Sequence, residues 1–149
     1  MSNDYPNPWN FSNADQNLKS PNGKYFILYD DLYEIAMGAP IGGACYLVFE
    51  NKKIKLSDFC GGPILWNNEG TKIALPIWTV NRCQQIAVID IQSRTKTLFK
   101  PMFRVLHFES FIGNIIFGID SPIHNTAKLV FNTESEPIES VTKIHINQG

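Results

Sequence analysis

WNNEGTKIALPIW, residues 66–78, decides the fold because it joins a tight turn to a strand. Glu69 and Gly70 form the predicted turn, since glycine readily takes the positive φ that a tight hairpin needs. The apolar run that follows is typical of a buried strand. The stretch therefore predicts a corner of an antiparallel sheet rather than an active site.

The same pattern occurs twice more in the chain. SPNGKYFILYDD, residues 20–31, has a polar turn ending in Gly23, and FIGNIIFGID, residues 111–120, has a turn at Gly113 and Asn114. Each turn precedes a run of β-forming residues. Gly23, Gly70 and Gly113 are 47 and 43 positions apart. This spacing predicts an internal repeat.

A second strand–turn–strand segment follows each glycine. The three segments are residues 44–56, 85–99 and 127–144. Their turns are expected at Asn51 and Lys52, at residues 92–94, and at residues 134–137. Leading strands are expected at residues 63–66 and 103–108. Each unit is therefore predicted to be a four-strand meander of about 40 to 47 residues, a length typical of β-propeller blades.

The second unit resembles a blade of the TolB/WD40-like propeller family. Family blades carry a Trp-Ser-Pro-Asp-Gly-Lys turn and a later Ile-Tyr-Val-Ile-Asp strand. The matching residues are WNNEGTK, residues 66–72, and IAVID, residues 86–90, while SPNGK, residues 20–24, is closer still to the family turn. The resemblance covers one unit well, a second fairly and a third poorly. It implies scaffolds or protein-binding surfaces and no single activity.

The predicted fold is all-β, with antiparallel meander repeats in one domain over residues 1–149. Residues 1–18 are expected to be irregular, and the blade-like units are placed at about 19–59, 60–101 and 102–146. Propellers usually close with four to eight blades. Three units are too few, so the chain either self-associates or packs two sheets as a sandwich or partial propeller. Lys52, Lys53 and Lys55 are interpreted as guards of an exposed strand edge.

Helix is expected at most in DDLYEIAMGAP, residues 30–40. Asp30 or Asp31 could cap the N-terminus of a short helix, and Gly38 and Pro40 could end it. The alternative is an ordinary connecting loop between strands.

The bulk composition is that of one globular domain. The 149 residues are 44% hydrophobic and carry a net charge of −1, so a nucleic-acid partner is not expected. Cys45, Cys60 and Cys83 are an odd number at wide spacing, which favours a reducing compartment over a disulfide framework. Neither a signal peptide nor an apolar run of about 18 residues is present. The sequence therefore predicts a cytoplasmic protein without a membrane partner.

Catalytic chemistry has no clear pattern in the sequence. His107, His124 and His145 are too widely spaced to predict a metal site, and no cofactor motif is found. Cys60 is expected to be an idle thiol. Five carboxylates at strand ends leave a glycosidase-like pair open, because nothing singles out two of them: Asp58, Glu69, Asp90, Glu109 and Asp120.

The candidate partner-binding residues come from two surface stretches. DDLYE, residues 30–34, combines carboxylates with an aromatic ring, and WTVNR, residues 78–82, places Trp and Arg close together. Charge steers a basic partner, and aromatic rings anchor it. The alternatives are a solvated loop and a core position for the tryptophan. The predicted site residues are Asp30, Asp31, Tyr33, Glu34, Trp78 and Arg82.

These observations favour a small non-catalytic binding protein. The most specific hypothesis is a bacterial immunity protein that neutralises a basic toxin domain by occluding its active site. A self-associating propeller-like scaffold is one alternative. A carbohydrate-binding protein or a hydrolase that uses strand-end carboxylates is the other. The oligomeric state is left open.

Overall fold

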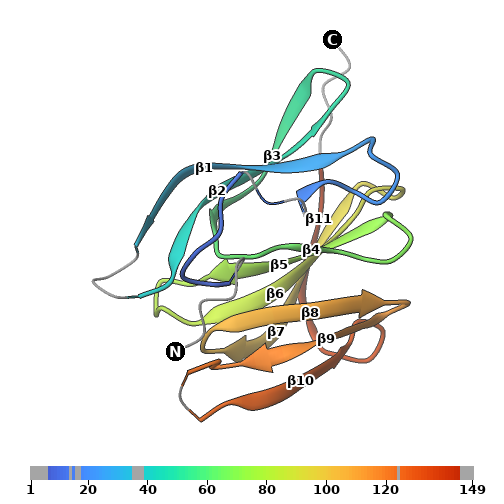
Figure 1. The fold of residues 1–149 in the computed structure, drawn as a ribbon. Helices are drawn as coiled ribbons and strands as arrows, with labels where there is room; N and C mark the ends of the chain where they lie inside the picture. The colour runs from blue at the N-terminus through green and yellow to red at the C-terminus, as the bar shows by residue number, and fades with distance from the viewer. Residues whose placement is uncertain (1–6, 14, 16–17, 35–38, 124, 145–149) are drawn as a thin grey trace.

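The computed structural model describes residues 7–13, 15, 18–34, 39–123 and 125–144. Within these ranges the chain forms eleven strands and no α-helix, and all strand pairing is antiparallel (Figure 1). The predicted all-β fold class is confirmed. The strands are β1 (Phe26–Glu34), β2 (Ile41–Phe49), β3 (Lys52–Cys60), β4 (Leu65–Trp66), β5 (Lys72–Trp78), β6 (Gln84–Asp90), β7 (Thr95–Phe103), β8 (Leu106–Ile112), β9 (Ile115–Asp120), β10 (Ala127–Asn132) and β11 (Ile138–Lys143).

Two sheets contain these strands. The larger runs β1-β2-β3-β5-β6-β7-β11, with β4 paired to β5, and the smaller runs β10-β9-β8. Between β3 and β5 the large sheet is held by a single residue pair, Cys60 with Ile77. The sheet folds over at this point, so β1–β3 lie above β5 and β6, and β8–β10 lie below β5 and β6 (Figure 1). The described sheets close into neither a propeller nor a barrel.

The β5–β6 hairpin is buried on both faces. Ile73 and Leu75 point into a first core shared with β1–β3, whereas Ala74 between them points into a second core shared with β8–β10. On β6, Ala87 and Ile89 belong to the first core, and Ile86 and Val88 belong to the second. Two-sided burial explains why both strands are almost continuously apolar.

The second core joins the two sheets. Phe99 of β7 meets Phe131 of β10 edge to face, with ring centroids 5.0 Å apart. Gln84 adds a polar link, because its buried side-chain Oε1 accepts a hydrogen bond from the Leu106 backbone N–H at 2.6 Å. The small sheet is thus fixed by packing and by a hydrogen bond in a nonpolar setting.

The three predicted glycine turns are confirmed and lie side by side. Gly23, Gly70 and Gly113 have φ of +76°, +74° and +60°. A Cβ on Gly70 would meet the Pro21 ring at 3.1 Å, and Asn68 donates its backbone N–H to the Phe111 carbonyl at 3.1 Å. We call this end of the molecule, where residues 20–24, 67–71 and 113–114 turn, the glycine end.

The first two residues of WNNEG, Trp66 and Asn67, fix the turn through hydrogen bonds of their side chains. The Trp66 indole N–H donates to the Leu18 carbonyl at 3.0 Å, which ties the N-terminal segment to the middle layer. The Asn67 side-chain oxygen accepts the backbone N–H groups of Thr71 and Lys72 at 2.8 and 3.0 Å. The motif is therefore the frame of a turn.

The predicted helix or loop at residues 30–40 is wrong for its first five residues. Asp30–Glu34 continue β1, where Tyr33 pairs with Gly42 and Glu34 with Ile41 across a bulge. The ladder with β2 overrides the capping signal of the two aspartates. Residues 35–38 lie outside the described part of the chain.

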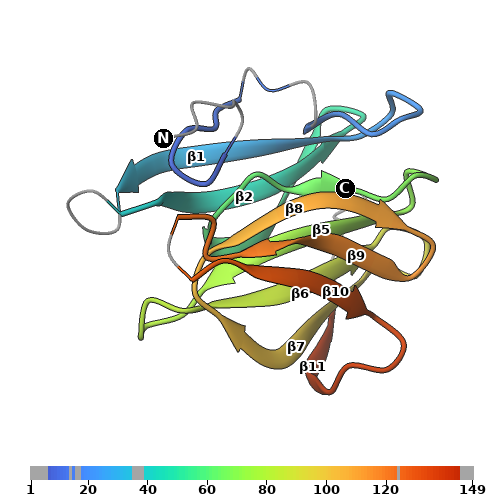
Figure 2. The same ribbon diagram turned by 60° about the horizontal axis from the view of Figure 1, so that its bottom comes forward.

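The four-strand meander is found only in the second unit, β4–β7. In the described residues the first unit has three strands, and in the third unit β11 does not pair with β10 as expected. It crosses to the edge of β7, beside which it lies in Figure 2. The long turn at residues 133–137 lets the chain change sheets, and the Gln85 amide donates to the Glu139 carboxylate at 3.1 Å.

Gly118→Ala is expected to destabilise the fold by about 1–3 kcal/mol, because a new methyl group would overpack β8 against β9. A Cβ at this position would overlap the His107 carbonyl oxygen, and backbone atoms cannot rotate away. Urea unfolding measures the change. Glu109→Ala, an exposed position on the same hairpin, should change the free energy of unfolding by less than about 0.5 kcal/mol. Equal effects of the two substitutions would contradict the close approach.

Candidate functional site

The end opposite the glycine end gathers the predicted site residues. Trp78 pairs with Gln84 and Gln84 with Phe103, so β5, β6 and β7 share this end, and the bond from Gln84 to Leu106 brings the start of β8 there. The start of β2 joins them, because a Cβ on Gly42 would lie 2.8 Å from the Trp78 ring. We call this surface, formed by residues 30–34, 79–83, 102–105 and 121–123, the loop end.

An aromatic row connects the two predicted stretches. The Tyr33 ring stacks on Phe59 with centroids 5.9 Å apart and an interplanar angle of 5°. Phe59 in turn lies 6.4 Å from Trp78 at 36°. Tyr33 is 53% exposed, so its ring is held by a neighbour while one side stays open to a partner. Phe59 is the residue that sequence reasoning missed.

Trp78 occupies a core position, so the prediction that it is an exposed anchor is wrong. Its side chain is only 5% exposed and lies against Gly42 and Gly61, where any Cβ would approach the indole within 3.0 Å. One edge of the ring, together with Phe59 and Ile77, lines a shallow hollow of about 360 Å³. Trp78 is therefore the buried end of the aromatic row.

The loop end also carries apolar side chains that were not predicted. Val80 is 97% exposed at the tip of the β5–β6 hairpin, which Thr79 closes by donating to the Cys83 carbonyl at 2.8 Å. Met102 at the end of β7 and Ile123 after β9 are 56% and 57% exposed. Val80 lies inside WTVNR, but the sequence prediction names Trp78 and Arg82 from this stretch and not Val80.

The charged members lie on two sides of this surface. Asp30 is half-buried on β1, Glu34 is exposed at its end, and Arg82 is exposed on the β5–β6 hairpin with φ of +61°. Asp31 belongs to β1 by its backbone, and its side chain is outside the described part. The site is thus acidic along β1 and basic at the neighbouring hairpin.

Asp90 and Asp120, two of the strand-end carboxylates considered for a catalytic pair, accept hydrogen bonds within tight connections instead. Asp90 accepts the backbone N–H groups of Gln92 and Ser93 at 3.0 and 3.1 Å. Asp120 accepts those of Arg104 and Val105, both at 3.0 Å. The two lie at opposite ends of the molecule. Carboxylates used in this way stabilise tight connections.

Cys60 lies in the first core beside Cys45 and Tyr29. Burial raises the pKa of the Cys60 thiol well above its ordinary value, and the neighbouring Cys45 adds to the effect. Burial likewise raises the pKa of Tyr29, whose hydroxyl oxygen accepts the Ile64 backbone N–H at 3.2 Å. A thiol that stays protonated is a poor nucleophile.

No three His, Cys, Asp or Glu side chains in the described ranges gather closely enough to hold a metal ion. A helix long and apolar enough to cross a membrane is likewise not found among these residues. Comparison with protein-family models, with curated proteins and with solved structures finds no match to this chain.

Trp78→Ala and Tyr33→Ala are expected to differ sharply in their effect on stability. Loss of the buried indole should lower the free energy of unfolding by about 3–5 kcal/mol. Loss of the half-exposed Tyr33 ring should cost about 1 kcal/mol or less, mainly its stacking on Phe59. Chemical denaturation measures both. Similar costs would mean that Tyr33 is a structural residue and not an available anchor.

Alkaline pH is expected to destabilise the protein through Tyr29 and Cys60. Both have raised pKa values in the folded state, so their contribution is complete below the ordinary values of 10.0 and 9.0 and is lost as pH rises above them. Tyr29→Phe should reduce the slope of stability against pH above pH 10 by up to about 1.4 kcal/mol per pH unit. Unfolding curves at several alkaline pH values test this, and an unchanged slope would contradict the burial of an un-ionised hydroxyl.

Proposed function

We propose that this chain is a non-catalytic protein-binding protein whose partner docks on the loop end. The observation that carries the proposal is the stacked Tyr33–Phe59 pair, half open to solvent, at the end of the molecule that also carries exposed Val80, Met102 and Ile123. Aromatic and Met side chains are enriched at protein interfaces, where a few of them supply most of the binding energy. Exposed apolar groups gathered at one end support docking better than scattered ones do.

Rigidity supports the same proposal. Val80 lies on the turn of the β5–β6 hairpin, which is buried on both faces, and Tyr33 lies on β1, which pairs with β2. Tyr33 is further fixed by its ring partner, so little side-chain freedom would be lost on binding. A surface that is already ordered binds with a smaller entropy cost than a flexible loop of the same composition.

In its most specific form the proposal is a bacterial immunity protein that occludes the active site of a cognate toxin. Asp30, Asp31 and Glu34 would face basic groups of the toxin, and Tyr33 would be the anchor. Arg82 would face an acidic group. Occlusion requires only a complementary surface, so no reactive side chain is needed in this chain.

The test uses tagged protein as bait in extracts of its source cells. Tyr33→Ala combined with Val80→Asp should weaken capture of the partner, and the purified pair should show at least a tenfold loss of affinity, about 1.4 kcal/mol. Val130→Asp, an exposed position on β10, is the matched control and should bind as the native chain does.

Two results would argue against the proposal. If the partner binds the double variant and the control equally well, the loop end is not the docking surface. If the partner depends on the loop end but has no toxic activity that this chain suppresses, the binding function stands and the immunity form is wrong.

A further inference from the structure

β3 has a strand on only one side for most of its length. It pairs with β2 from Lys52 to Ser57, but on the other side its only strand partner in the described residues is β5, at Cys60. The Leu56 carbonyl, which lies in this stretch, accepts a hydrogen bond from the Lys96 ammonium at 3.0 Å. The Lys96 side chain of β7 thus donates to a carbonyl that would otherwise accept a backbone N–H from a neighbouring strand.

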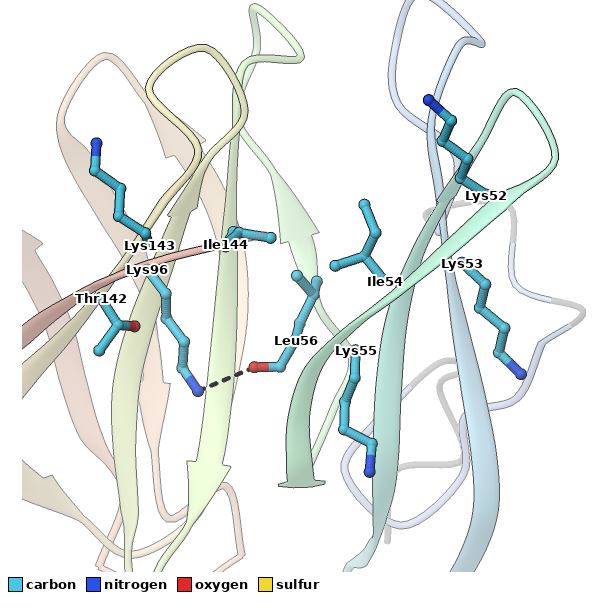
Figure 3. Close-up of a pocket in the computed structure, with 9 residues that line it drawn as sticks. All are labelled: Lys52, Lys53, Ile54, Lys55, Leu56, Lys96, Thr142, Lys143 and Ile144. Atoms are coloured by element: carbon cyan, nitrogen blue, oxygen red, sulfur yellow. Dashed lines mark hydrogen bonds between the residues drawn. The ribbon is translucent and has the colours of Figure 1, made fainter. Parts of the chain in front are cut away.

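An open cleft of about 560 Å³ runs along this edge, between β3 on one side and β7 and β11 on the other (Figure 3). Ile54, Leu56 and Ile144 project toward the space between the two walls, as Figure 3 shows. Lys96 and Lys143 belong to the wall formed by β7 and β11. The cleft therefore combines an apolar interior with an unpaired strand edge.

The cleft is strongly basic although the chain as a whole is not. Five of its lining residues are lysines: Lys52, Lys53, Lys55, Lys96 and Lys143. Lys55 forms an ion pair with Asp58 at 2.7 Å within the described residues. The other four have no carboxylate partner there. Four uncompensated charges on a chain of net charge −1 select for an anionic ligand.

The lysines come from both walls of the cleft. On β3, the Lys53 and Lys55 amines lie 4.3 and 5.9 Å from the Tyr46 ring centroid. Across the cleft, Lys96 belongs to β7 and Lys143 to β11. Lysines along an edge prevent pairing with ordinary strands. The same charges would favour a strand that carries carboxylates, so the lysines that prevent pairing with ordinary strands also select for an acidic one.

We propose that the cleft binds an extended acidic peptide segment of a partner, which adds to the free edge of β3 as a further strand. Strand addition satisfies the backbone groups of the edge, and side-chain pockets select alternate residues. Six residues, Lys52 to Ser57, offer about 20 Å of edge. The fitting segment alternates acidic residues with apolar ones, so that carboxylates meet lysines while the apolar side chains meet Ile54 and Ile144.

This site does not depend on the loop end or on the proposed function. Its lining residues are different, and the variants that test the two surfaces do not overlap. A partner could use either surface alone or both together, in which case the two contacts would reinforce one another.

The test measures binding of a fluorescent peptide of about eight residues, in which Glu and Val alternate, to the full-length protein by anisotropy. The expected result is saturable binding that is lost when alternate peptide nitrogens are methylated, because methylation removes the donors a strand needs. Amide exchange along Lys52–Ser57 should slow when the peptide binds. A peptide that alternates Lys and Val should not bind.

Lys52→Glu combined with Lys143→Glu should weaken binding at least tenfold, because both residues line the cleft, while their pairing with Phe49 and Thr95 in the sheet is made by the backbone. Lys100→Glu combined with Lys128→Glu makes the same change in net charge at exposed lysines outside the lining of the cleft and should leave affinity unchanged.

Three results would overturn the proposal. The first is no binding of the Glu-Val peptide. The second is binding that survives methylation of its backbone, which would indicate charge attraction without strand pairing. The third is cleft-dependent binding of a single-stranded oligonucleotide in place of the peptide, which would identify the site as a phosphate-backbone groove.

Discussion

Burial of the β5–β6 hairpin on both faces holds the layers of the structure together. Residues 73–75 and 86–89 alternate between two cores, so each core uses the same two strands as one of its walls. β1–β3 complete one core and β8–β10 complete the other. A change in the register of this hairpin would exchange the residues facing the two cores and would disturb both at once.

Both proposed binding surfaces follow from this arrangement. The loop end exists because antiparallel hairpins built on one central pair return their connections to the same side. The basic cleft exists because the large sheet is joined between β3 and β5 at one residue pair only, so β3 departs from the sheet and leaves its edge open. The proposed surfaces thereby lie at the margins of a rigid middle layer, where exposed groups can be varied without cost to the core.

The sequence predicted the parts of the fold that local chemistry controls. Gly23, Gly70 and Gly113 have positive φ because tight turns require it, and the alternating apolar runs became strands. The assignment of β11 to a hairpin with β10 failed because strand partners are chosen by long-range contacts. The helical reading of Asp30–Glu34 failed for the same reason, since pairing with Ile41 and Gly42 outweighs two possible capping residues.

The sequence predicted where the candidate site lies better than it predicted which of its side chains are exposed. DDLYE and WTVNR do meet at one end, but the tryptophan is buried, whereas Tyr33 and Val80 are exposed. Burial of a large ring depends on which strand lies over it, and Gly42 supplies the space for Trp78 from a distant part of the chain. The lysines of β3 were read as an edge guard, and only the tertiary structure adds Lys96 and Lys143 opposite them.

Native-state hydrogen exchange of the backbone amides would test the central role of the β5–β6 pair most directly. If the two cores depend on this pair, its amides should exchange last, at the rate of global unfolding, while β1 and β11 at the sheet edges exchange earlier through local opening. Slower exchange in β2–β3 or β8–β9 than in β5–β6 would contradict the account. It would show that one outer layer, and not the middle one, holds the fold together.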